Sequence, residues 1–201
     1  MDTHSEITIP LKSLKITTDP QLMTDMYSMF VVLQLHRGLF RFLPDGTLMP
    51  DLVESWTESP DRKSYTFKLR KSVFSDGSAL TAENVVWTFH RLFRTRSPMG
   101  IDMQNIIKGA RDFIGTKGAS TLGIRAIDDL TVEFELEEPS SLFLRQIAVV
   151  DCAILPLHKH LTDWSENLPT SGPYKLLKRN TNEIVVQKWR QNPYESSRPP
   201  F

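Results

Sequence analysis

Residues 38–70 of the chain read GLFRFLPDGTLMPDLVESWTESPDRKSYTFKLR, and they determine the expected fold more than any other stretch. Residues 53–57 and 64–70 alternate apolar and polar side chains with the period of two that is typical of a half-buried β-strand. The Ser-Pro-Asp-Arg segment between them, residues 59–62, favours a turn, so the two strands are predicted to form a hairpin. Another turn is expected at residues 44–47, where Pro-Asp-Gly-Thr follows a short strand-like segment.

Two more hairpins are expected downstream. One pairs residues 123–127 with residues 130–136, and the other pairs residues 174–178 with residues 184–189. An extended segment at residues 7–11 precedes them all. Strands therefore outnumber helices and pair with neighbours along the chain, which indicates the α+β class.

Helices are expected at fewer places. Residues 22–35 carry Met, Leu, Val and Phe on more than one helical face, so this helix is predicted to be buried. Thr81 is expected to cap a helix whose apolar face includes Val85 and Phe89 and which ends at residues 97–100. Shorter elements are expected at residues 105–113 and 139–148 (helices), 154–155 (a buried strand) and 156–161 (a helical turn).

The balance of charge excludes one large class of partner. The 201 residues carry 24 basic and 24 acidic side chains, so there is no basic excess to attract a phosphate backbone, and nucleic-acid binding is not expected.

No apolar run approaches the ~18–20 residues needed to cross a bilayer. The start MDTHSE has neither the basic residues nor the apolar core of a leader peptide. The chain is thus expected either to stay inside the cell or to have lost its leader.

Motifs for catalysis and metal binding are absent from the sequence, which contains no G-x-S-x-G, H-E-x-x-H or G-x-x-x-x-G-K-[ST] segment. His158 and His160 lie two residues apart in an expected helical turn, where such side chains diverge, so no metal site is predicted. Cys152 is the single cysteine and has apolar neighbours, so we expect a buried thiol and no intrachain disulfide. Neither an enzyme nor a cofactor is expected.

Several motifs resemble one protein family. Residues 38–56 resemble the opening of the family 5 extracytoplasmic solute-binding proteins, which reads GL…DG.L.P.LAESW. Residues 65–85, YTFKLRKSVFSDGSALTAENV, resemble the family's next motif, YTF.LR..V.F.DG..LTAEDV. The order and spacing also agree for GIRAIDDLTV (123–132), SGPYKL (171–176) and NPY (192–194). The departures are small, with Ser171 in place of a usual Thr and Asn84 in place of a usual Asp.

The resemblance implies the fold of periplasmic binding proteins of class II, cluster C, in which two hinged lobes close on a ligand. Residues 1–201 resemble the N-terminal part of lobe one, a mixed sheet with β-hairpins and flanking helices. Within it, residues 38–175 approximate the family's additional β-rich subdomain. Family members are considerably longer, so we expect the second lobe and the returning C-terminal segment to be absent from this chain.

The function implied by the resemblance is that of the substrate-binding component of an ABC importer. Such a receptor holds peptides or similar small solutes, including a metal chelate, and docks on a membrane permease. A monomer without a nucleic-acid partner is expected, in the periplasm or lipid-anchored at the cell surface. The alternative is a ligand-sensing module of a transcription regulator with the same fold, which would require DNA-binding sequence upstream.

Family members contact the ligand from three places in lobe one: the loop and helix after the first strand, the loop after the LTAEDV helix, and the segment before the LP strand end. Asp25 or Asp151 could pair with the amino terminus of a peptide, and a solvated helix start or a capping aspartate is the alternative for each. Tyr27 and Met29 could equally lie in the core. Mapped by position, the candidate ligand-binding residues are Asp25, Tyr27, Met29, Met99, Gly100, Val149 and Asp151.

Overall fold

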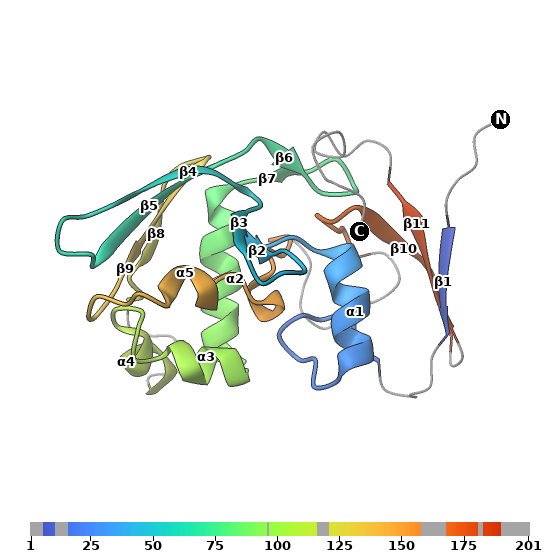
Figure 1. The fold of residues 1–201 in the computed structure, drawn as a ribbon, viewed down its shortest axis with the longest axis horizontal. Helices are drawn as coiled ribbons and strands as arrows, with labels where there is room; N and C mark the ends of the chain where they lie inside the picture. The colour runs from blue at the N-terminus through green and yellow to red at the C-terminus, as the bar shows by residue number, and fades with distance from the viewer. Residues whose placement is uncertain are drawn as a thin grey trace.

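The computed structural model describes residues 6–10, 16–95, 97–115, 121–157, 168–180 and 183–189. Figure 1 shows the elements in these ranges. The first half contains β1 (Glu6–Pro10), α1 (Met26–Leu35), β2 (Phe40–Phe42), β3 (Leu48–Pro50), β4 (Val53–Glu58), β5 (Ser64–Leu69), β6 (Ser72–Val73), β7 (Ala79–Leu80) and α2 (Ala82–Arg94). The second half contains α3 (Pro98–Met103), α4 (Ala110–Gly115), β8 (Ile124–Asp128), β9 (Thr131–Glu135), α5 (Phe143–Gln146), the 3-10 helix η1 (Val150–Cys152), β10 (Tyr174–Arg179) and β11 (Glu183–Lys188).

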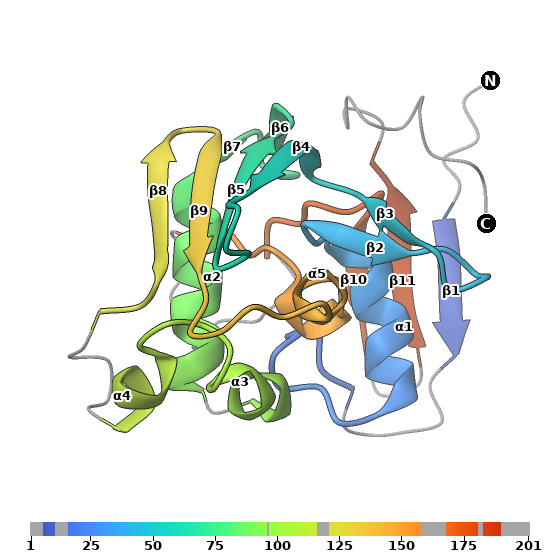
Figure 2. The same ribbon diagram turned by 60° about the vertical axis from the view of Figure 1, so that its left-hand side comes forward.

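A four-stranded antiparallel sheet and the helix α2 form the larger part of the fold (Figures 1 and 2). The strand order is β4-β5-β9-β8, and α2 packs against β8 and β9. Val85 and Phe89 of α2 are fully buried, and the Phe89 ring meets the Phe134 ring of β9 edge to face at 5.0 Å between centroids. Each such side chain stabilises the fold by roughly 1.5–3 kcal/mol, so this interface holds the larger core together.

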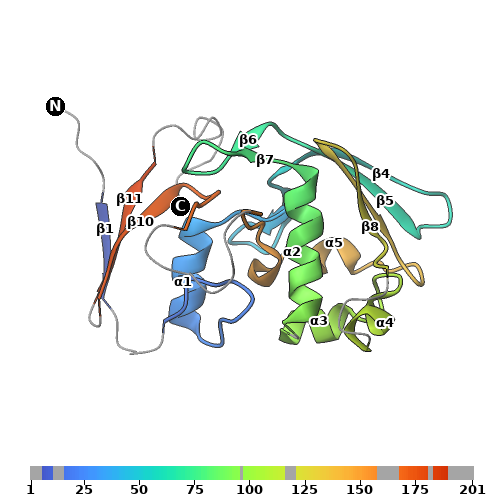
Figure 3. The ribbon, with the colours of Figure 1, turned by 180° about the vertical axis from the view of Figure 1, so that it is seen from behind.

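A three-stranded sheet lies at the other end of the molecule, next to α1 (Figure 3). Its order is β1-β11-β10, with both pairs antiparallel, so the first described strand joins the last one. This sheet and α1 enclose a second, smaller apolar cluster made of Ile16, Val31, Leu35, Ile184 and Val186.

Two buried ion pairs fix the loops on either side of α1. Arg91 of α2 pairs with Asp19 in the preceding loop, and its Nη1 also donates to Gln21 Oε1 at 2.6 Å. Arg37, which follows α1, pairs with Asp51, which precedes β4. All four charged side chains are buried. Because removing one partner would leave a buried charge uncompensated, at a cost of about 3–5 kcal/mol, these pairs hold both ends of α1 in place.

The three predicted hairpins are confirmed as β4–β5, β8–β9 and β10–β11. The extended segment at the start is confirmed as β1, and Thr81 is the N-cap of α2. The backbone N–H of Thr81 donates to Asn84 Oδ1 at 2.9 Å, which satisfies a donor ahead of the first turn. In the described ranges, no helix combines the length and the apolar character needed to cross a membrane.

The prediction for residues 22–35 is wrong in two respects. The helix begins at Met26, because Asp25 caps it by accepting a hydrogen bond from Ser28 N at 2.9 Å. The helix is also not buried all round. Phe30 is 51% exposed and Leu33 is 42% exposed, so one apolar face of α1 remains open.

The shorter elements also differ from the predictions. The expected strand at residues 154–155 is buried but not part of a sheet, because Ile154 N donates to Arg37 O at 2.8 Å and Leu155 N donates to Thr88 Oγ1 at 3.0 Å. Of the helix expected at residues 105–113, only residues 110–113 are helical, as part of α4, and Ile107 instead forms an isolated antiparallel bridge with Leu136. The helix expected at residues 139–148 is confirmed only as α5. The helical turn predicted at residues 156–161, with His158 and His160, lies largely outside the described residues.

Candidate functional site

An open groove of approximately 670 Å³ lies where α1, β2 and the segment around η1 meet. Figure 2 shows α1 and β2 side by side in this region. The lining is mostly apolar. It includes Met29, Phe30 and Leu33 from α1, Phe40 and Phe42 from β2, and Ala148, Val149, Val150 and Ala153 from the segment after α5.

The helix α1 is unusual because its outward face is apolar as well as its inward face. Val31, Val32 and Leu35 are at most 1% exposed and pack inward, whereas Phe30 and Leu33 line the groove. A large apolar side chain left in water gains roughly 1.5–3 kcal/mol when it becomes fully buried. The outer face of α1 is therefore suited to contact a further apolar surface.

The wall formed by β2 is anchored in the larger core. Phe40 is 2% exposed and meets the rings of Trp56 and Phe67 edge to face, at 5.3 Å and 5.7 Å between centroids. Phe42 is partly exposed and lies under the Arg145 guanidinium, 5.0 Å from the ring centroid. Because Phe40 is held on two sides, the groove wall is rigid at its base.

The floor of the groove is tied together by backbone and side-chain hydrogen bonds. Arg37 N donates to Ser171 Oγ at 3.0 Å, and Arg37 O accepts from Ile154 N. Gly172 N donates to Leu35 O at 2.8 Å. Segments distant in sequence therefore converge on the C-terminal end of α1, which fixes the shape of the groove.

His36 lies at this floor and is 3% exposed. Burial lowers the pKa of His36 to about 4, and the Thr18 backbone opposes this lowering only in part. Apart from this interaction with the Thr18 backbone, neither ring nitrogen has a well-formed hydrogen bond within the described part of the chain. The imidazole is therefore neutral at physiological pH and contributes no positive charge to the groove.

Asp151 of η1 also lines the groove and is half-buried. Burial raises the pKa of Asp151 above its ordinary value, and only its own backbone opposes this. Arg41 of β2 is partly buried on the same groove. Within the described ranges neither side chain forms an ion pair, whereas the groove carboxylate of Asp51 is paired with Arg37. The groove thus contains one acidic and one basic group for a ligand to use.

The candidate residues from the sequence separate into three groups. Met29, Val149 and Asp151 line the groove together. Asp25 and Tyr27 lie at the start of α1 outside the lining, and both carboxylate oxygens of Asp25 bond Ser28, at 2.9 Å to N and 2.6 Å to Oγ. This geometry agrees with the capping alternative for Asp25.

Met99 and Gly100 form the third group, in the first turn of α3, and do not line the groove. Met99 packs against the larger core. Gly100 is buried so tightly that a Cβ there would lie 2.6 Å from Leu92 O. These positions have a packing role in the structure.

Phe30, Leu33, Phe40 and Phe42 line the groove but were not among the sequence candidates. One signal was present, because residues 22–35 carry apolar side chains on more than one face. We interpreted that pattern as complete burial, but a helix with a core on one side and a groove on the other gives the same pattern.

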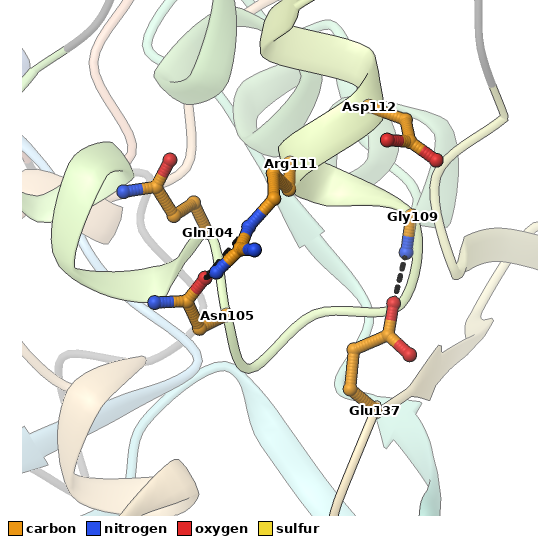
Figure 4. A pocket seen from close by; sticks show the side chains of 6 residues that line it. All are labelled: Gln104, Asn105, Gly109, Arg111, Asp112 and Glu137. Carbon is orange, nitrogen blue, oxygen red and sulfur yellow. Dashed lines mark hydrogen bonds between the residues drawn. The ribbon is translucent and has the colours of Figure 1, made fainter.

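A second, smaller hollow of approximately 290 Å³ lies beside α3 and α4 (Figure 4). Its polar groups bond one another: Arg111 Nε donates to Asn105 Oδ1 at 3.2 Å, and Gly109 N donates to Glu137 Oε1 at 2.9 Å. Among the described residues there is no cluster of three or more His, Cys, Asp or Glu side chains able to hold a metal ion. The apolar groove is therefore the better candidate for a ligand.

Comparison with known proteins gives a consistent result. Residues 47–200 match the family described as bacterial extracellular solute-binding proteins, family 5 Middle. The chain is 32% identical over 187 residues to the probable deoxycholate-binding periplasmic protein YgiS of Escherichia coli, covering 88% of this chain and 35% of that protein. It is 33% identical over 178 residues to the periplasmic oligopeptide-binding protein OppA of Salmonella typhimurium, covering 84% of this chain and 33% of that protein.

Solved structures agree with these relatives. The substrate-binding domain of an oligopeptide ABC transporter from Bacillus anthracis superposes with a TM-score of 0.79 at 29% identity, covering 90% of this chain and 37% of that one. The murein tripeptide-binding protein MppA of Escherichia coli gives a TM-score of 0.79 at 26% identity, covering 88% and 36%. The chain thus spans about a third of the length of the proteins that it resembles.

Proposed function

The chain belongs to family 5 of the bacterial extracellular solute-binding proteins, and on this premise we propose that it forms one wall of the ligand cleft of an ABC-importer receptor for peptides or similar small solutes. Its fold is that of the periplasmic binding proteins related to OppA. The comparisons give no support to the alternative of a sensor module in a transcription regulator.

One observation carries this proposal. The apolar groove of α1, β2 and η1 is open on one side and exposes large side chains such as Phe30 and Leu33. A ligand held there would still have one face in water. Closure of a second wall over that face would bury both the ligand and the outer side of α1, which favours the closed state through differential affinity.

The proposed activity is binding without chemical conversion. The relatives are named as binding proteins. Burial in the larger core raises the pKa of the Cys152 thiol, which keeps it protonated and unreactive. Capture and release then depend on shape and polarity alone.

A second ligand class is favoured by a specific observation. YgiS is named as a probable deoxycholate-binding protein, and the groove lining here is mostly apolar with a few polar groups. An amphipathic molecule with a rigid apolar body would fit such a lining as well as an apolar peptide does. Deoxycholate is therefore the second probe to test.

Partners, location and domain limits belong to the same proposal. We place the receptor with a membrane permease, on the periplasmic side or lipid-anchored at the cell surface, as a monomer that binds no nucleic acid. Residues 1–201 would belong to lobe one, with residues 38–175 as its β-rich subdomain. Light scattering of the purified chain at rising concentration tests the monomer, and a mass that doubles with concentration would contradict it.

The binding proposal is tested by titrating the isotope-labelled chain with Leu-Gly-Gly and with deoxycholate while backbone amide shifts are recorded. We expect shifts at groove residues such as Leu33, Phe40 and Val149, and none at the polar hollow around Arg111. If a complete cleft bound at about 1 μM, half of that free energy would correspond to about 1 mM for one wall. Shifts confined to another surface, or sub-micromolar binding by this chain alone, would refute the one-wall proposal.

A further inference from the structure

Two guanidinium groups lie at the β2 end of the groove. Arg41 belongs to β2, lines the groove and is partly buried. Arg145 of α5 lies over the neighbouring Phe42, 5.0 Å from the ring centroid, and its Nη2 donates to Gly46 O at 3.5 Å. Within the described residues neither arginine forms an ion pair. This end of the groove is therefore positively charged.

The carboxylates nearby do not cancel this charge. Asp51, which also lines the groove, is paired with Arg37. Asp151 lies on η1, where burial raises its pKa, and neither of the two arginines is among the causes of that shift. Hydrogen bonds within the turn after β2 lower the pKa of Asp45, again without a contribution from an arginine. A ligand carboxylate would therefore supply a counter-charge that the described part of the chain does not give to Arg41.

The surface beside these cations is apolar. Phe40 and Phe42 of β2 form one wall of the groove, and the exposed side chains of Phe30 and Leu33 of α1 form another. A rigid hydrocarbon body would bury its surface against both walls without bringing in polar groups that need partners. The groove thus combines a cationic end with a broad apolar trough, which is complementary to an amphipathic anion.

We propose that the groove binds an amphipathic carboxylate, whose charged group pairs with Arg41 while its apolar body lies between α1 and β2. This inference rests on the proposed function and specifies the ligand class of the same groove. A guanidinium presents a planar set of donors that matches a carboxylate, and the partial burial of Arg41 limits screening by salt. Arg145 is exposed, so its share of the affinity should be smaller.

The test is a double-mutant cycle between protein and ligand. The chain and its Arg41→Gln variant are each titrated with deoxycholate and with its uncharged amide, at concentrations too low for micelles, and the dissociation constants are read from amide shifts. We expect loss of the ligand charge to weaken binding to the wild-type chain about tenfold and binding to the variant by less than twofold. Arg111→Gln, in the polar hollow beside α4, is the matched control and should behave as the wild type does.

A peptide also ends in a carboxylate, so Leu-Gly-Gly is titrated to separate the two sources of this group. Its carboxylate follows two glycines and has no apolar body next to it. Arg41→Gln should therefore change the affinity for Leu-Gly-Gly by less than twofold. An equal loss for Leu-Gly-Gly and for deoxycholate would overturn the assignment of an amphipathic anion, because any carboxylate would then suffice.

The remaining results separate failure of this inference from failure of the proposed function. If deoxycholate and its amide bind the wild-type chain equally, or if Arg41→Gln weakens both by the same factor, the carboxylate does not lie at Arg41. If Leu-Gly-Gly shifts groove amides and deoxycholate shifts none, the proposed function stands and the inference is wrong. If neither ligand shifts any groove amide, both are wrong.

Discussion

Replacement of His36 by leucine should remove most of the acid sensitivity that this residue gives to the fold. The ordinary imidazole pKa is 6.5, and burial lowers the pKa of His36 to about 4 in the folded chain. Between these two values the unfolded chain binds a proton that the folded chain does not, so stability falls as the pH falls. Each unit of pH in this window costs about 1.4 kcal/mol, and the full loss near pH 4 is about 3 kcal/mol.

The stability difference between His36→Leu and the wild-type chain should grow as the pH falls. Above pH 6.5 both states hold His36 neutral, and the stability that depends on it is fully present. At pH 7.5 the His36→Leu variant should be as stable as the wild-type chain or slightly more stable, because it removes two buried nitrogens that have no well-formed hydrogen bond in the described part of the chain. At pH 4.5 the variant should be more stable by about 2–3 kcal/mol.

Urea denaturation at half-unit steps from pH 7.5 to pH 4.5, for both proteins, measures the difference directly. His90→Leu is the control, because burial and Arg94 also lower the pKa of His90 but its side chain is only half-buried. It should show a smaller change of the same sign. A stability difference between wild type and His36→Leu that stays constant across the range would refute the reasoning.

Three other predictions concern the groove and its supports. Leu33→Asp, on the open face of α1, should change the free energy of unfolding by no more than about 0.5 kcal/mol. It should weaken the binding of Leu-Gly-Gly by about 1 kcal/mol, and an unchanged affinity in the amide titration would contradict this. Gly172→Ala places a Cβ 2.5 Å from Gln34 O and should lower the free energy of unfolding by about 2 kcal/mol, as measured by urea denaturation. Equal urea midpoints for the variant and the wild-type chain would show that α1 can shift away from residue 172. Asp51→Asn leaves Arg37 buried without its ionic partner and should cost about 3–5 kcal/mol in the same assay, and a loss below 1 kcal/mol would show that water reaches the guanidinium.

The parts of the fold that could be predicted from the sequence are those stabilised locally. Hairpins β4–β5 and β8–β9 are predicted by alternating apolar and polar side chains on either side of a turn. The cap at Thr81 likewise depends on only a few adjacent residues. The start of α1 was predicted four residues early because the apolar pattern begins at Leu22, whereas the Asp25 cap decides where hydrogen bonding starts.

The groove could not be predicted in the same way, because its walls come from segments far apart along the chain. Residues 29–42 and 148–153 both line the groove, and the hydrogen bond from Ile154 N to Arg37 O links the two segments. The same contact explains why residues 154–155 are apolar and extended yet lie outside any sheet. Family resemblance placed Met29, Val149 and Asp151 near a ligand, but nothing in a linear pattern distinguishes an open apolar helix face from a buried one.

The pairing of β1 with β11 has a consequence for how the molecule assembles. These strands come from opposite ends of the described chain, with Ile7 opposite Val186. During synthesis β1 leaves the ribosome long before its partner exists, whereas the hairpins and α2 can form as soon as they emerge. Closing so long a loop is slow and entropically costly, so the three-stranded sheet should be the last part to form and the first to open.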